Sequence, residues 1–179
     1  DLGLDADAVI ELNSLGDPAS REAILKGLRD YFQPVLEQLS PLSQDRFKTN
    51  PLRILDSKTA EDKPFIDSAP QVVDFLNDAS RAHFMTVLEY LDEAGVPYDL
   101  NPLLVRGLDY YTNTVFEIRD RTDDRRQAVL AAGGRYDGLV EILGGQPTPA
   151  FGFGMGIERI AAKMIEKHLP VDPEPRTEI

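Results

Sequence analysis

The chain has 179 residues, 42% of them hydrophobic and 28% charged, which is the composition of an ordinary globular protein with one or two domains. It contains no cysteine, so disulfides, thiolate metal sites and a thiol nucleophile are excluded. Its 31 acidic and 19 basic residues give a net charge of −12, which argues against a general polyanion-binding surface. Any contact with a nucleotide or nucleic acid must therefore be local.

The two ends of the chain indicate a piece of a longer protein. The sequence begins at Asp1 without a methionine and ends in a polar, proline-broken stretch, residues 170–179. No apolar tract is long enough for a membrane span, and the first residues do not have the pattern of a signal peptide. We therefore expect a cytoplasmic protein without membrane contact.

The first predicted elements are a strand and a long helix. Between Val9 and Asn13, apolar and polar side chains alternate, as in a half-buried strand. Asp17 followed by Pro18 predicts a helix start, because the aspartate can cap the helix and proline is favoured at its first position. Pro34 should kink or end this helix. Its predicted apolar face consists of Ile24, Leu28, Phe32, Val35, Leu36 and Leu39.

The middle of the chain predicts further helices. Residues 40–76 are rich in Pro, Ser, Asp and Asn, which favours short helices and loops. A second long helix is predicted from Ser80 to Ala94, with Gly95 as its left-handed C-terminal residue. We expect the two long helices to pack together.

From Tyr98 onward the pattern changes to strands. Thr114–Ile118 and Arg126–Ala132 predict an antiparallel hairpin joined by the charged turn Arg119–Arg125. Phe151–Met155 predicts a third strand. A closing helix, Ile157–His168, is predicted to carry an apolar stripe formed by Ile160, Ala161, Met164 and Ile165.

The predicted fold class is α+β, with a mainly helical segment inserted between stretches of a mixed sheet. In this division, residues 1–17 and 96–169 form one unit, residues 18–95 form the helical insertion, and residues 170–179 form a polar tail.

The segment LVRGLDYYTNTVFEI combines groups that could bind a planar anion and a small aromatic ring. The fork of donors on Arg106 suits a carboxylate or phosphate oxygen, and Tyr110 and Tyr111 could hold a small aromatic ring. The simpler interpretation is that both tyrosines belong to the core and that Arg106 forms a surface ion pair with Asp109. Physical arguments alone favour the simpler one.

The segment AAGGRYDGLVEILGG predicts a strand that passes into a helix near Tyr136. Gly133 and Gly134 would let a ligand approach the backbone, and the hydroxyl of Tyr136 could point into the same space. The alternative is an ordinary turn in which Asp137 caps the helix.

In the segment TPAFGFGMGIERI, glycines recur at every second position, which predicts one strand face without side chains. Such a face, formed by Gly152, Gly154 and Gly156, suits a flat ligand or another backbone. Arg159 should lie in the first turn of the next helix, where the helix dipole also favours an anion. The alternative is tight packing of sheet and helix, with Arg159 paired to Glu158 or another acid.

The pattern contains no metal site, because His83 and His168 lack partners at ligand spacing. No catalytic Ser/His/Asp order, P-loop or dinucleotide fingerprint is present either.

These segments together resemble the histidyl-tRNA synthetase family. LVRGLDYYTNTVFEI resembles a segment peculiar to that family, and FGFGMGIERI resembles the third signature of class II synthetases, a glycine-bearing strand that leads into a helix with an ATP-binding arginine. AAGGRYDGLVEILGG, VIELNSLG and NPLRILDSK are similar to segments of family members as well, so the resemblance covers nearly the whole chain.

The resemblance implies a class II synthetase-type sheet and two-step aminoacylation. Histidine and ATP with Mg²⁺ would give histidyl-adenylate, and the histidyl group would then move to the acceptor end of tRNA(His). No organic cofactor or protein nucleophile is implied. The helical insertion would approach the tRNA acceptor stem.

The resemblance also implies a role for each matched residue. Arg106 would be the catalytic residue, holding the histidine carboxylate and the α-phosphate. The histidine pocket would also contain Tyr110, Tyr111, Tyr136 and Gly134. Arg159 would bind the outer phosphates of ATP, with the adenylate lying on Gly152, Gly154 and Gly156.

Several expected parts of the family are missing from this sequence. The first two class II signatures, the ligands of the histidine ammonium group and the anticodon domain are not found, so the chain alone is expected to be inactive. A homodimer is expected for the full-length protein. The main rival is the synthetase-like regulatory subunit of ATP phosphoribosyltransferase, and a third possibility is an acidic interaction module without a ligand. The intact GMGIER, Gly154 to Arg159, favours the enzyme.

Overall fold

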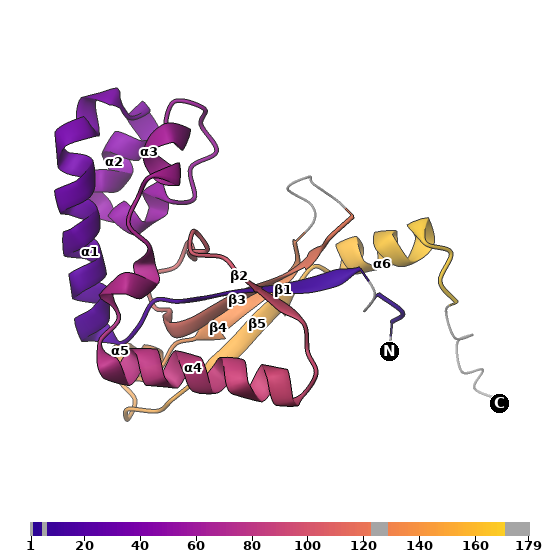
Figure 1. The fold of residues 1–179 in the computed structure, drawn as a ribbon. Helices are drawn as coiled ribbons and strands as arrows, with labels where there is room; N and C mark the ends of the chain where they lie inside the picture. Colours follow the sequence, from indigo (N-terminus) through magenta and orange to yellow (C-terminus); the bar gives the residue numbers. More distant parts are fainter. Residues whose placement is uncertain (1, 5–6, 123–128, 171–179) are drawn as a thin grey trace.

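The computed structural model describes residues 2–4, 7–122 and 129–170. A five-stranded sheet has the order β2-β1-β3-β4-β5, with helices beside and beneath it (Figure 1). Strands β1 and β2 are parallel, whereas all other neighbours are antiparallel. The predicted α+β class with a mixed sheet is confirmed. The strands are β1 (Ala8–Ser14), β2 (Tyr98–Leu100), β3 (Thr112–Asp120), β4 (Val129–Arg135) and β5 (Phe151–Met155).

The predicted hairpin corresponds to β3 and β4, which pair directly. Part of its predicted turn and second strand, residues 123–128, lies outside the described residues, as does the predicted tail after Pro170.

Between β1 and β2 the chain forms a helical segment, as predicted. The side chain of Asp17 accepts a hydrogen bond from the amide of Ser20 at 2.8 Å and so caps α1. Helix α1 changes to a 3-10 helix at Gln33, next to Pro34. The segment contains α1 (Pro18–Phe32), η1 (Gln33–Gln38), α2 (Pro41–Thr49), η2 (Pro51–Ile54), α3 (Lys63–Asp67), η3 (Val72–Phe75) and α4 (Asp78–Glu93).

Helix α4 begins two residues earlier than predicted, because Asn77 caps it by accepting a hydrogen bond from the amide of Ser80 at 2.9 Å. Its end is as predicted, with Gly95 at a φ of +66° just after the helix.

The apolar faces of α1 and α4 do not pack together, so that prediction is wrong. Ile24 and Leu28 of α1 belong to the larger buried cluster, together with η2 and η3. Phe84 of α4 belongs to a second cluster with Leu12 on the sheet. The helices diverge from a shared corner, with α4 beneath the sheet (Figure 1), and their N-terminal ends are joined by a 3.1 Å hydrogen bond between serine hydroxyls, those of Ser20 and Ser80.

The larger cluster also contains Leu15, Leu104 and Val115, which flank or belong to the sheet. The helical segment therefore shares its core with the sheet. The division into an insertion of residues 18–95 and a core of residues 1–17 and 96–169 stays a prediction.

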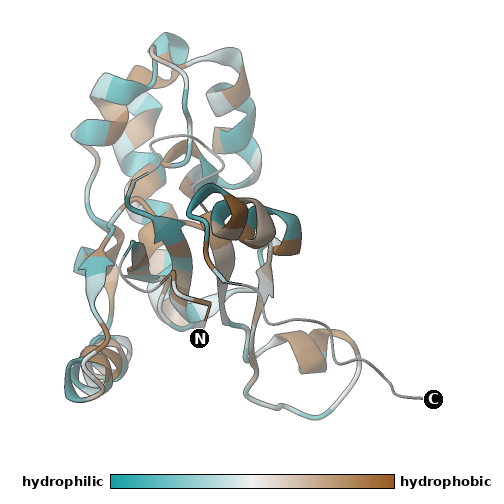
Figure 2. Ribbon diagram, turned by 90° about the vertical axis from the view of Figure 1, so that its right-hand side faces the viewer, coloured by the Kyte–Doolittle hydropathy of each residue, from teal (hydrophilic) through white to brown (hydrophobic). Residues whose placement is uncertain are grey.

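Apolar side chains remain exposed at the end of the molecule formed by β5 and α6 (Ile157–Glu166), an end that Figure 2 faces. Phe153 is 58% exposed and Ile165 is 73% exposed. In the predicted stripe on α6, Ala161 and Ile165 are exposed, whereas Ile160 and Met164 are partly buried. The buried residue of the helix is Lys163, which pairs with Asp120 at 3.0 Å. Within the described residues, no helix has the length and apolar character needed to cross a membrane.

Candidate active site

One face of the sheet carries the polar residues of the candidate site. Phe116 of β3 packs against the cluster between the sheet and α4, so Glu117, the next residue, points to the opposite side. The strand register places Glu11 of β1 and Ala132 of β4 beside Glu117, and Gly154 of β5 beside Ala132. We call this side the site face.

The glycines of β5 lie on the site face, as predicted. Phe151 is on the other face, where its ring stacks on Phe116 with a centroid distance of 5.7 Å. Gly152 and Gly154 alternate with it, and a Cβ atom on Gly154 would meet no atom within 4 Å. The site face is open at this point and could accept a flat ligand.

Gly156 does not extend the strand, so this part of the prediction is wrong. It is the N-cap of α6, and its amide donates to the carbonyl of Leu130 at 2.9 Å. The backbone at Gly156 is still extended, with φ −85° and ψ 91°, but the strand ends one residue earlier, at Met155.

Three tyrosines from two parts of the sequence, Tyr110 with Tyr111 and Tyr136, meet beside the glycines of β4 and β5. The ring centroids of Tyr110 and Tyr111 lie 4.8 Å apart, and those of Tyr110 and Tyr136 lie 5.7 Å apart. A Cβ atom on Gly134 would lie 3.0 Å from the ring of Tyr111, and one on Gly152 would lie 2.3 Å from the hydroxyl of Tyr136. These two glycines first of all make room for the tyrosines.

The tyrosines differ in burial. Tyr111 is 6% exposed and belongs to the larger core cluster, as the simpler interpretation expects, whereas Tyr110 and Tyr136 are only partly buried. Burial, and then the hydrogen bond with Tyr111, raises the pKa of Tyr110, so its hydroxyl stays protonated at neutral pH. The hydroxyl of Tyr110 is therefore able to donate a hydrogen bond.

Arg106 adjoins the tyrosine cluster and pairs with an acid that we did not predict. Its Nη1 donates to Oε1 of Glu117 at 2.7 Å, and its Cζ lies 5.8 Å from the centroid of the Tyr111 ring. The expected pair with Asp109 is wrong, because Asp109 lies beyond a turn and contacts the helical segment, where Arg21 is 3.4 Å away.

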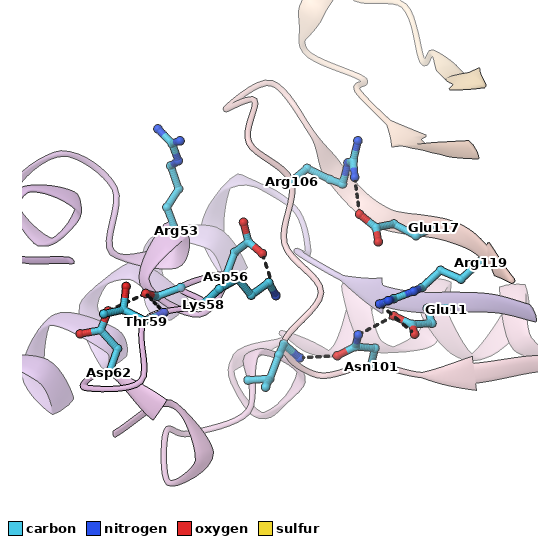
Figure 3. Close-up of polar contacts among 12 residues, drawn as sticks. Glu11, Arg53, Asp56, Lys58, Thr59, Asp62, Asn101, Arg106, Glu117 and Arg119 are labelled. Atoms are coloured by element: carbon cyan, nitrogen blue, oxygen red, sulfur yellow. Dashed lines mark hydrogen bonds and ion pairs between the residues drawn. The ribbon is translucent and has the colours of Figure 1, made fainter. Parts of the chain in front are cut away.

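Glu117 and its neighbours form a half-buried charged row on the site face (Figure 3). Burial raises the pKa of Glu117, while the charges of Arg106 and Arg119 act in the opposite direction. Glu11 pairs with Arg119 at 3.5 Å and accepts a hydrogen bond from Asn101 at 2.6 Å. The sequence signal for Glu117 and Arg119 was their alternation with the apolar residues Phe116 and Ile118.

Arg159 lies in the first turn of α6, as predicted, but Glu158 is not its partner. Its Nη1 donates to the carbonyl of Val129 at 2.9 Å. The side chain lines a hollow of about 880 Å³ that also contacts Glu117. The other charged side chains of this hollow are Arg46, Asp56, Lys58 and Arg119.

Four basic and two acidic side chains thus line this hollow, in a chain whose net charge is −12. The positive charge is local, as a nucleotide contact requires. Through Glu117, this hollow adjoins the guanidinium of Arg106. Across the described residues, no group of three or more His, Cys, Asp or Glu is placed to hold a metal ion.

The fold and the site define a class of protein. A glycine-bearing strand of a mostly antiparallel sheet leads into a helix whose first turn carries an arginine, the arrangement of the third signature of class II aminoacyl-tRNA synthetases. A family model described as histidyl-tRNA synthetase matches residues 14–160. The chain belongs to the histidyl-tRNA synthetase family.

Relatives and solved structures agree with this assignment. A curated histidine–tRNA ligase of Streptococcus agalactiae is 47% identical over 174 residues, which are 97% of this chain and 40% of that protein. The crystal structure of the apo histidyl-tRNA synthetase of Staphylococcus aureus has a TM-score of 0.73 and 38% identity, covering 96% of this chain and 41% of that one.

A structure from Bacillus halodurans described as an ATP phosphoribosyltransferase regulatory subunit/histidyl-tRNA synthetase has a TM-score of 0.53 over 89% of this chain and 44% of its own. At 21% identity, it shows a shared fold only. The chain spans about 40% of the length of the curated relatives that it matches.

Proposed function

We propose that this chain is part of a histidine–tRNA ligase, which activates histidine with ATP and transfers the histidyl group to tRNA(His). The observation that carries the proposal is the placement of Arg106 beside three tyrosines on the open glycine face of the sheet. A planar cationic fork next to aromatic rings suits an amino acid with an aromatic side chain and a carboxylate that must be activated.

In the proposed reaction, the carboxylate of histidine attacks the α-phosphate of ATP, the bond between the α- and β-phosphates breaks, and pyrophosphate leaves. Negative charge builds on the phosphate oxygens, and Arg106 can donate two parallel hydrogen bonds, one to the carboxylate and one to that phosphate. Tyr110, Tyr111 and Tyr136, with Gly134, would enclose the imidazole ring. The protein residues bind and orient the reactants, and none acts as a nucleophile.

ATP would lie along Gly152 and Gly154, with Gly156 at the end of the strand and Arg159 on the outer phosphates. Support comes from the open space above Gly154 and from the excess of basic side chains in the hollow beside Arg159. Mg²⁺ would arrive with ATP as part of the substrate, and no organic cofactor is proposed.

The acceptor end of tRNA(His) is the proposed third substrate, used in the second step, and residues 18–95 are proposed as the part that approaches the acceptor stem. We propose a homodimer for the full-length protein and a cytoplasmic location, because tRNA charging serves translation there.

The test of this proposal is Arg106→Lys in the full-length protein. Lysine keeps the charge but offers no planar fork, so the contact specific to the transition state should be lost while binding of the ground state partly survives. We expect the single-turnover rate of adenylate formation to fall by a factor of about a hundred or more, equivalent to ~2.7–4 kcal/mol.

The control is Arg81→Lys. Arg81 donates to a backbone carbonyl, that of Val73, and lies on α4, away from the site. A folded Arg106→Lys protein, checked by circular dichroism, whose rate is within a few-fold of that control would remove Arg106 from the catalytic role.

A further inference from the structure

We propose that Glu117 is a positioning residue that orients the guanidinium of Arg106 toward the site. This inference rests on the proposed function of Arg106, and it assigns a role to a side chain that does not contact the substrates itself.

The contact between the two side chains is short and shielded. Nη1 of Arg106 lies 2.7 Å from Oε1 of Glu117, and the side chains are 23% and 17% exposed. An ion pair shielded to this degree is screened less by water and salt than one at the surface. In the described part of the chain, Nε of Arg106 is buried without a hydrogen-bond partner. The pair with Glu117 is therefore the strong polar contact that fixes the plane of the guanidinium.

The supporting elements differ in rigidity. Arg106 belongs to an irregular segment between β2 and β3, and the backbone around it makes no regular ladder. Glu117 belongs to β3, which is paired on both sides, to β1 and to β4. Because β3 is held on both sides, the carboxylate of Glu117 can hold in place the side chain of Arg106, which comes from a loop. The aromatic ring of Tyr111 restricts the movement of the Arg106 guanidinium on one further side.

A neighbouring acid shows that burial and charge alone do not create this role. Glu11 lies directly opposite Glu117 in the ladder, and its side chain is 19% exposed. It has the same charge and nearly the same burial, but it contacts Arg119 and Asn101. Glu11→Gln is therefore a closely matched control for Glu117→Gln.

The proposed role predicts a particular division between rate and affinity. Without the charge of Glu117, Arg106 is no longer neutralised, so its attraction for the carboxylate of histidine should persist. The guanidinium is free to rotate, however, and its two donors should no longer meet the reacting groups together. The rate of the chemical step should fall while the KM for histidine does not rise.

The experiment compares five variants of the full-length protein: Glu117→Gln, Glu117→Asp, Glu11→Gln, Arg106→Lys and Glu117→Gln combined with Arg106→Lys. The single-turnover rate constant of histidyl-adenylate formation is measured, because it does not depend on the fraction of active protein. We expect Glu117→Gln to slow this step on the order of tenfold, the effect of weakening one charged hydrogen bond. Glu11→Gln should remain within about twofold of the unmodified protein.

Two further results are expected. Glu117→Asp keeps the charge on a shorter side chain. Its rate constant of adenylate formation should lie between those of Glu117→Gln and the unmodified protein. In the Arg106→Lys background, Glu117→Gln should cause less than about twofold additional slowing, because the two residues act as a unit. If Glu117→Gln does not fold, Glu117→Asp replaces it in the double-mutant cycle with Arg106→Lys.

The inference is overturned if Glu117→Gln is no slower than Glu11→Gln, or if its effect is undiminished in the Arg106→Lys background. A different result contradicts the proposed function itself, namely an Arg106→Lys protein that forms the adenylate at the normal rate.

Discussion

Arg106 and Arg159 are held in different ways, and the difference bears on what each can do. Arg106 is fixed by a charged partner, Glu117, whereas Arg159 is exposed and donates to one backbone carbonyl, that of Val129. A carbonyl is neutral and is a weaker acceptor than a carboxylate or phosphate. Arg159 can therefore leave it for the outer phosphates of ATP at little cost.

The prediction for this residue concerns Arg159→Ala in the full-length protein. Loss of a charged hydrogen bond to ATP should weaken the binding of ATP by ~1.5–3 kcal/mol. The KM for histidine and the thermal stability of the protein should change little. ATP–pyrophosphate exchange at varied concentrations of each substrate measures this. Arg81→Ala is the control, because Arg81 is likewise exposed and bonded to a backbone carbonyl. An ATP KM equal to that of the control would show that the phosphate assignment is wrong.

At the scale of elements, one buried carboxylate joins three segments of the helical part. Asp62, before α3, is fully buried. It accepts hydrogen bonds from the amide and hydroxyl of Ser40 at 2.7 and 2.8 Å, from Ser43 at 2.6 Å and from Ser57 at 2.5 Å. Burial acts to raise the pKa of Asp62, but these hydrogen bonds outweigh it, so the pKa is lowered.

Asp62→Asn is expected to destabilise the chain by about 1.5–3 kcal/mol at pH 7, because an amide offers fewer acceptor sites to these donors. Since the folded-state pKa of Asp62 is lowered, its contribution is present at neutral pH and disappears as the pH falls through that pKa. The difference between the two proteins in urea unfolding should therefore shrink in acid. The control is Asp67→Asn, an exposed acid paired with Lys63, for which we expect at most about 0.5 kcal/mol.

A second prediction at this scale is that Gly134→Ala disturbs the contact between β4 and the tyrosine cluster. The new Cβ would lie 2.5 Å from the carbonyl oxygen of Thr114 and 3.0 Å from the ring of Tyr111, so backbone must shift. We expect a loss of about 1–3 kcal/mol in stability and a raised KM for histidine in the full-length protein. Gly138→Ala is the control, because a Cβ there would meet nothing within 4 Å. It should leave the stability and the KM for histidine unchanged. Equal melting temperatures for the two variants would contradict the predicted clash.

At the scale of the molecule, the chain spans about 40% of the length of its curated relatives and leaves apolar side chains on β5 and α6 exposed. We expect no histidine-dependent ATP–pyrophosphate exchange by the purified chain, because the resemblance implies further ATP and ammonium ligands outside it. Exchange by the full-length protein is the positive control. Exchange by the chain at a rate near that of the full-length protein would contradict this expectation.

The local sequence determined most of the helices and strands. Caps such as Asp17, breakers such as Pro34 and the period-two glycines at Gly152 and Gly154 act within a few residues, so their effects were predictable. Where the chain departs from these predictions, as at Gly156 and at Asn77, the difference is one of a strand or helix boundary.

Tertiary structure decided which side chains meet. With 31 acidic and 19 basic residues, local sequence offered many partners for Arg106, and only the alignment of β3 with its neighbours selected Glu117 rather than Asp109. In the same way, apolar periodicity showed that α1 and α4 each bury a face, but not that the two faces lie in different clusters. Periodicity fixes the direction of a side chain relative to its own element, whereas contacts between elements depend on packing and strand register across the whole chain.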